Sequence, residues 1–329
     1  MRRIFVESEF APLRRVVVAQ CEMRLPDPDF ASPELVAAEA AILPEAERAT
    51  MLQLLGRDHA EAMPARQRAW EAERQALCRV LEKHGVEVLR PDRLTPAQKE
   101  AGGKAGWANA YVRDPWFTVG DTVIEGSLRF PHRRLEVLPS RALMRREVVP
   151  STARYVAVPQ PDIVPLDEDS DRAGPFLEGG DVLVLGRHVF VGQSGRASSA
   201  TGVAFLAKLL APLGYTVEAV RLKPTVLHLD CALGLVRDGL MVVCPSLFLD
   251  GVPARLAGWD RIEVSEAEAM TLATNGLPVS PDLYITDPAF RRIGEAVARR
   301  GVRVAYVDFA ISRAFGGAFR CSTQALLRE

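Results

Sequence analysis

The chain has 329 residues, of which 48% are hydrophobic and 25% charged, a composition typical of a soluble globular protein with a large core. Its 41 lysines and arginines nearly balance 42 aspartates and glutamates, so the net charge of −1 offers no attraction for nucleic acid or an anionic membrane. No run is long and apolar enough to span a bilayer, and we expect a cytoplasmic protein with neither kind of partner.

Five cysteines are scattered along the chain. An odd number without paired spacing suits neither a disulfide framework nor a zinc knuckle, so we expect mostly reduced thiols. Cys321 is set apart from the others, because it lies close to the C-terminus and shortly after a glycine pair, Gly316 and Gly317.

Short valine-rich runs bounded by glycine, proline or aspartate predict strands. In chain order they are residues 13–19, 86–91, 117–126, 181–192, 233–245 and 302–309. Three of the runs contain a residue pair typical of a hairpin turn. These pairs are Gly120-Asp121, Gly186-Arg187 and Asp238-Gly239.

Helical periodicity predicts helices within residues 33–84, 199–214 and 288–301. A glycine ends each of the last two and leads into a strand, so the unit of hairpin, helix and strand recurs. Such repetition indicates one domain built from similar blades. Residues 45–74 could form an inserted helical arm, although a solvated helix pair is the interpretation that we favour. The proline- and aspartate-rich loop 160–174 has a position that suits a lid.

Two polar motifs lie at the start of predicted strands. In YVRDPWFTVGD, Asp114 precedes Pro115, which disfavours helix and directs the chain into the next strand. Asp114 would then face a cleft, or else be an ordinary loop aspartate. In FLEGGDVLVLG, Glu178 and Asp181 flank two glycines, which allow another group to approach the backbone closely. Turn chemistry alone would also explain the glycines.

Two further motifs carry a histidine and a cysteine. In TVLHLDCALGLV, His228 and Asp230 are one residue apart in an expected strand and would point to the same face. The histidine could instead be a core residue or a metal ligand. The other histidines provide no ligand spacing, so we expect no metal and no cofactor. Cys321, in GGAFRCST, could equally be a buried structural residue.

Together these motifs resemble those of a known superfamily. RDPWFTVGD, EGGDVLVLGRHVFVGQSGR, HLDCAL and GGAFRCST are similar, in the same order, to motifs of the guanidine-modifying pentein enzymes: arginine deiminases, dimethylarginine hydrolases and amidinotransferases. The likeness extends from about Glu7 to the C-terminus. It implies an α/β fold, a five-bladed propeller with pseudo-fivefold symmetry and a central capped site, formed by a single domain over residues 1–329.

The resemblance also implies roles for individual residues. Cys321 would be the nucleophile, His228 the general acid and base, and Glu178 the carboxylate that orients the histidine. Asp114 and Asp230 would bind the guanidinium, which two carboxylates hold in a fixed plane. Arginines in places resembling those that bind a substrate carboxylate in deiminases are Arg196 and Arg133 or Arg134.

The expected intermediate is an S-amidino or S-alkylamidino cysteine, and the second nucleophile decides the activity. With water the chain would hydrolyse arginine or an arginine-like guanidine; with an amine it would be an amidinotransferase. The opening FVESEFAPLRRVVVA and LEKHGVEVLRP resemble the antibiotic-pathway amidinotransferases in layout, but EGGD and the tail GGAFRCST depart from them. The sequence therefore favours hydrolysis slightly and keeps transfer as the alternative.

Two other classes remain open. A non-catalytic pentein binding module would not need Cys321, His228 and Glu178 together. A cysteine protease or a transglutaminase-like enzyme would also use cysteine and histidine, but two further carboxylates suit a cationic substrate better than a neutral amide. We expect a small guanidino compound as the partner, and a homo-oligomer is compatible with the sequence.

Overall fold

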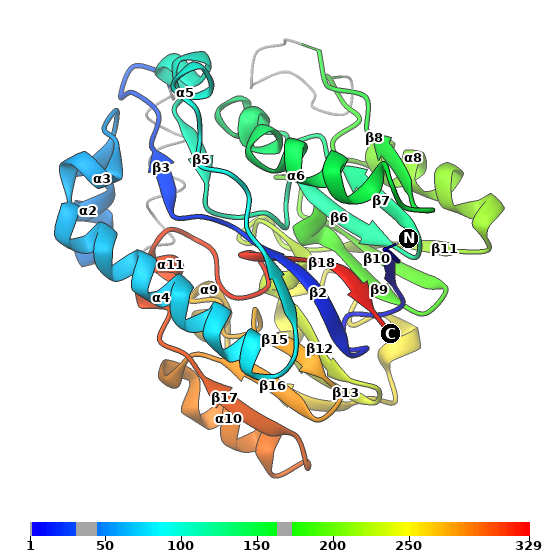
Figure 1. The fold of residues 1–329 in the computed structure, drawn as a ribbon. Helices are drawn as coiled ribbons and strands as arrows, with labels where there is room; N and C mark the ends of the chain where they lie inside the picture. The colour runs from blue at the N-terminus through cyan, green and yellow to red at the C-terminus, as the bar shows by residue number, and fades with distance from the viewer. Residues whose placement is uncertain (1, 31–44, 163–172) are drawn as a thin grey trace.

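The computed structural model describes residues 2–30, 45–162 and 173–329. The described chain forms several small β-sheets, and helices cover their outer sides (Figure 1). None of the helices in these ranges is long and apolar enough to cross a membrane.

Four of the sheets repeat one unit, an antiparallel strand pair and a third strand that runs parallel to the second. The first of these units contains β6 (Trp116–Val119), β7 (Thr122–Glu125), η2 (Pro131–Val137), α6 (Leu138–Val148) and β8 (Arg154–Ala157). The next contains β9 (Val182–Leu185), β10 (His188–Gln193), α8 (Ala200–Leu210) and β11 (Thr216–Arg221). The third contains β12 (Leu233–Arg237), β13 (Leu240–Val243) and β14 (Asp260–Glu263). The fourth contains β15 (Leu277–Ser280), β16 (Leu283–Thr286), α10 (Arg291–Ala298) and β17 (Arg303–Tyr306).

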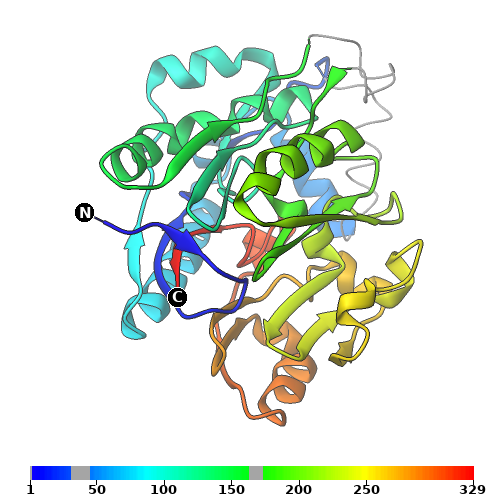
Figure 2. The same cartoon turned by 90° about the vertical axis from the view of Figure 1, so that its right-hand side faces the viewer.

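The fifth unit is built from both ends of the chain. The last strand, β18 (Thr323–Arg328), pairs antiparallel with β2 (Leu13–Val18) and parallel with β1 (Phe5–Val6). β4 (Glu87–Leu89) completes the sheet, parallel to β2. The first and the last strand therefore lie side by side (Figure 2). The five similar units confirm the predicted pseudo-fivefold propeller, and they explain the late position of Cys321, which directly precedes the strand that closes the ring.

The predicted hairpin turns are confirmed. The strands on either side of each predicted pair are antiparallel partners. Gly120, Gly186 and Gly239 have φ angles of 54°, 59° and 72°, a left-handed conformation that favours glycine.

The helical region before β4 differs from the solvated pair that we favoured. It contains α2 (Glu45–Leu54), α3 (His59–Ala62) and α4 (Pro64–Lys83), while residues 31–44 lie outside the described residues. α4 buries Trp70, Leu77 and Leu81 completely. The indole of Trp70 also donates a hydrogen bond of 3.1 Å to Ser312 Oγ in α11 (Ala310–Ala314). The expectation failed because buried side chains are few among residues 45–74, and the apolar stripe that anchors α4 runs from Trp70 past the end of that range to Leu81. The proposed lid, residues 160–174, lies mostly outside the described residues.

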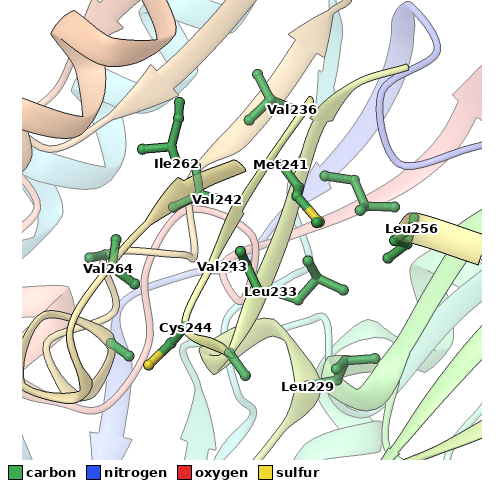
Figure 3. Packing of buried hydrophobic residues seen from close by; sticks show 14 of the residues in the cluster. Leu229, Leu233, Val236, Met241, Val242, Val243, Cys244, Leu256, Ile262 and Val264 are labelled. Atoms are coloured by element: carbon green, nitrogen blue, oxygen red, sulfur yellow. The ribbon is translucent and has the colours of Figure 1, made fainter. Parts of the chain in front are cut away.

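A large apolar cluster surrounds the sheet of β12, β13 and β14 (Figure 3). Leu229, which separates His228 from Asp230, is part of this cluster and is fully buried. Burying one such side chain contributes about 1.5–3 kcal/mol to stability. The core therefore fixes the backbone between two polar residues that the sequence places in the site.

Candidate active site

Each blade contributes a buried polar residue that one to three residues separate from the start of its first strand. The sequence predicts four of them, in four blades: Asp114, Glu178, Asp230 and Cys321. The remaining blade, which begins with β15, contributes Asn275, which the sequence analysis missed. All five residues are at most 4% exposed.

His228 lies between two of these carboxylates. Its Nε2 is 2.8 Å from Glu178 Oε2, and its Nδ1 is 3.7 Å from Asp114 Oδ1. Burial by itself lowers the pKa of His228, but the charge of Asp114 and the hydrogen bond with Glu178 outweigh burial and raise the pKa to about 10. The imidazole is therefore a cation at neutral pH.

The histidine does not lie in a strand, contrary to our expectation. His228 precedes the short 3-10 helix η5 (Leu229–Cys231), and β12 starts only at Leu233. The backbone N–H of Leu229 donates to Asp181 Oδ1 at 3.0 Å, and the other oxygen of this carboxylate accepts from Ser198 N–H at 3.1 Å. The Asp181 carboxylate thus accepts the hydrogen bond that a neighbouring strand would otherwise accept from Leu229. The alternation of polar and apolar residues in the sequence gives no sign of this contact.

The glycines of the EGGD motif allow the histidine and a carboxylate to approach the backbone closely. A Cβ atom on Gly180 would lie 2.6 Å from Asp114 Oδ1 and 2.7 Å from His228 Nδ1. Gly179 is equally restricted, because its Cβ would lie 2.1 Å from the carbonyl oxygen of Arg113. The predicted close approach is thus present, and it occurs between groups of the candidate site.

We expect Gly180→Ala to lower kcat by about 100-fold, because a displacement of about 1 Å is enough to misalign reacting groups. Gly258→Ala is the matched control, since a Cβ there would have no atom within 4 Å. Steady-state kinetics and thermal unfolding of both variants check the prediction. A Gly180→Ala protein with wild-type kcat would show that this approach is not needed for turnover.

Cys321 and Asp230 belong to a second buried cluster. The thiol Sγ is 3.7 Å from Asp230 Oδ2, and the same oxygen accepts a hydrogen bond of 2.9 Å from Arg320 Nη1. Glu9 accepts from Arg320 through both of its oxygens, at 2.9 and 3.1 Å. Sequence reasoning missed Arg320 and Glu9. Arg320 lies in GGAFRCST and Glu9 in the opening FVESEFAPLRRVVVA, and neither segment gives a signal that the two side chains meet across the fold.

One strained turn holds the backbone of both Asp230 and Cys321. Leu272 has a φ angle of 69°, which is unusual for a residue other than glycine. Two residues further on, Thr274 Oγ1 donates to the carbonyl of Asp230 at 2.8 Å, and Asn275 Oδ1 accepts from Cys321 N–H at 3.2 Å. The turn thus ties the proposed nucleophile to a proposed guanidinium ligand.

Burial and nearby charge both favour the neutral form of the Cys321 thiol in the free protein. Burial raises its pKa well above the ordinary range of a thiol, and the charges of Asp230 and Asp114 raise it further. A thiolate is therefore expected only when a cation offsets these two carboxylates.

We expect iodoacetamide to alkylate Cys321 of the free protein slowly at pH 7, because the raised pKa leaves little thiolate. The rate should still increase well above about pH 8.5, the ordinary pKa of a thiol. Peptide-resolved mass spectrometry is needed, since Cys231 lines the same cavity. A rate that reaches its plateau below about pH 8.5, the ordinary range of a thiol, would contradict this assignment.

The two clusters border one cavity of about 230 Å³. Among the predicted residues, its walls include Asp114, His228, Cys321, Arg133 and Arg196. Apolar walls come from Met23, Trp107, Phe130, Met270 and Phe315.

The predicted arginines occupy different places. Arg196 lines the cavity, and its Nη1 is 3.5 Å from the carbonyl of Pro224. Arg134 is not among the lining residues, and its Nη2 is 3.4 Å from the carbonyl of Arg129. Arg133 is largely buried, and its guanidinium forms ion pairs with Asp114 and Glu178.

A metal ion is the other occupant that this chemistry could suggest. Asp114, Glu178 and His228 offer three ligand atoms within 4.8 Å of one another. A ligating histidine must be neutral, whereas the same carboxylates raise the pKa of His228 to about 10 and also bind Arg133. The charges in this cluster therefore favour a cationic acid between two carboxylates.

Comparisons with known proteins agree with this architecture. The family model described as arginine deiminase matches residues 107–280, more than half of the chain. An inosamine-phosphate amidinotransferase of Streptomyces glaucescens is 27% identical over 278 residues, which cover 77% of this chain and 78% of the relative.

Two solved structures show the same fold. The inosamine-phosphate amidinotransferase of Streptomyces griseus has a TM-score of 0.78 and 23% identity, covering 99% of this chain and 97% of that one. A Pseudomonas aeruginosa DDAH structure in complex with citrulline has a TM-score of 0.64 and 19% identity, covering 95% and 99%. The chain belongs to the arginine deiminase family, within the pentein superfamily of guanidine-modifying enzymes.

Proposed function

We propose that this chain cleaves a C–N bond of a guanidinium through a covalent intermediate on Cys321, and that it hydrolyses arginine or an arginine-like guanidine. One observation carries the proposal: the Cys321 thiol, the Asp114 carboxylate and a histidine with a raised pKa, His228, line a single cavity. The buried Asp230 carboxylate lies directly behind the thiol, 3.7 Å from Sγ. A binding module would have no use for this costly arrangement of charges.

Asp114 and Asp230 hold the substrate cation in this mechanism. Because the two carboxylates raise the pKa of Cys321, a guanidinium placed beside them lowers that pKa and releases the thiol proton to water. The thiolate then forms a C–S bond to the central guanidinium carbon. The binding of the substrate thus generates the nucleophile that attacks it.

His228 supplies the proton for the leaving group. Its imidazolium donates this proton to the departing nitrogen as the C–N bond breaks, which leaves a neutral imidazole and an amidino group on sulfur. Glu178, 2.8 Å from Nε2, orients the ring and stabilises its cationic form. In the second step the neutral histidine takes a proton from water, the oxygen adds to the amidino carbon, and the C–S bond breaks.

Transfer to an amine is the second candidate. It is supported by the sequence relative from Streptomyces glaucescens, which is an amidinotransferase and matches along most of its length. The first step is the same in both candidates, and only the molecule that discharges the intermediate differs.

The test is a reaction with arginine in the absence and presence of amine acceptors such as glycine, ornithine and an amino sugar. Hydrolysis predicts citrulline and ammonia without an acceptor, and a rate that the acceptor changes little. Transfer predicts a stalled enzyme that only the amine restores, with ping-pong kinetics. Product formation that requires the amine would make the transferase the better assignment.

A further inference from the structure

Arg133 places a guanidinium of the protein itself in the proposed guanidinium site. Its Nη2 donates to Asp114 Oδ2 at 2.8 Å, and its Nη1 is 3.3 Å from Glu178 Oε2. Glu136 accepts from Nε at 2.9 Å and from Nη2 at 2.8 Å. Only 11% of the arginine side chain is exposed, so it is built into the wall of the cavity.

These contacts compete with those that a substrate needs. A planar guanidinium binds a carboxylate most strongly through two parallel hydrogen bonds, one to each oxygen. Arg133 occupies Oδ2 of Asp114, and among the described residues Oδ1 is buried without a hydrogen-bond partner. A substrate guanidinium can therefore reach one oxygen of Asp114 in this arrangement but not both.

Arg133 also has an anchor on the other side. Glu136 lies on the same 3-10 helix, η2, and binds Arg133 through two hydrogen bonds that do not involve Asp114. The arginine can give up Asp114 and keep a buried countercharge, so its release leaves no unpaired guanidinium in the wall.

We propose that Arg133 is an internal competitor of the cationic substrate at Asp114. A planar cation with two N–H groups binds both oxygens of Asp114 only by displacing Arg133, whereas a neutral ligand does not compete for this carboxylate. After turnover the neutral product has no charge with which to hold Asp114, and Arg133 returns and expels it. This inference rests on the proposed function, because it concerns the same carboxylate.

The test compares two reagents that alkylate cysteine and have almost the same shape. 2-Chloroacetamidine is a planar cation, and 2-chloroacetamide is its neutral counterpart. The rates at Cys321 are measured with both reagents by peptide mass spectrometry, in the wild type and in Arg133→Met. The control is Arg134→Met, a neighbour on η2 that is not among the residues lining the cavity.

Arg133→Met should raise the ratio of the amidine rate to the amide rate at Cys321 by about 10-fold or more. In this variant Asp114 is always free to bind the cationic reagent. Arg134→Met should leave the ratio at its wild-type value. A ratio that stays the same or falls in Arg133→Met would overturn the proposal. Arg133→Gln keeps a donor but no charge and should raise the ratio by a smaller factor, which keeps the test open if the methionine variant does not fold.

The same measurement separates this inference from the proposed function. If neither reagent modifies Cys321 preferentially in any variant, the cysteine is not the nucleophile and the proposed function fails. If Cys321 reacts selectively but the ratio is independent of Arg133, the function stands and the competitor role is rejected.

Discussion

Cys321→Ser should reduce kcat by at least about 1,000-fold, or roughly 4 kcal/mol of activation free energy. The hydroxyl is far harder to deprotonate than the thiol, and the site already opposes a negative charge through Asp230 and Asp114. Steady-state kinetics with the preferred guanidine measure the loss.

The fold and substrate binding should survive this change. Serine has nearly the same volume, and its backbone N–H can still donate to Asn275 Oδ1. Cys244→Ser is a matched control, because Cys244 is a buried free thiol outside the residues that line the cavity. It should change stability alone. Appreciable turnover by Cys321→Ser would remove the covalent mechanism.

The two proposed guanidinium ligands should differ from each other when neutralised. Asp114→Asn should lower kcat/KM by about 100-fold or more, because a charge-assisted contact to the cation is lost at the reacting centre. Its melting temperature should change little, since Arg133 keeps Glu136 and Glu178 as partners.

Asp230→Asn should lower activity as strongly and stability as well. Arg320 is 3% exposed and would lose one of its two countercharges. A buried charge left with no partner lowers the free energy of unfolding by about 3–5 kcal/mol, and the loss is smaller here because Glu9 remains. Thermal unfolding and kinetics are measured for both variants and for Asp250→Asn, an exposed surface partner of Arg221. Equal stability losses at Asp114 and Asp230 would contradict the distinct environments described above.

Much of the repeating architecture could be predicted from the sequence. Valine-rich runs, turn pairs and helical periodicity are local signals, and the hairpins around Gly120, Gly186 and Gly239 follow from them. In four of the five blades the three strands are also consecutive along the chain. The motif residues could be predicted because the sequence resembles the pentein motifs at those positions.

The remainder depends on contacts between distant segments. The closing strand β18 needs β2 as a partner, and nothing local in the C-terminal segment announces that pairing. Asn275 stands in an ordinary turn sequence and becomes a site residue only through its place in the blade. The sequence predicts a strand at His228 and Asp230 because polar and apolar residues alternate there. A tight turn that buries Leu229 between two polar residues has the same alternation. Arg133 was expected to face a substrate carboxylate, but three acids of the protein surround it.

Mass spectrometry of the protein quenched during turnover tests the central claim most directly. With arginine as the substrate, the peptide that contains Cys321 should carry an adduct, and every other cysteine should be unmodified. The mass of the adduct also identifies the bond that breaks: arginine less ammonia indicates loss of the terminal nitrogen, and a bare amidino group indicates loss of the amine. An active enzyme that shows no adduct on Cys321 at any quench time, or an adduct on another residue, would contradict the account.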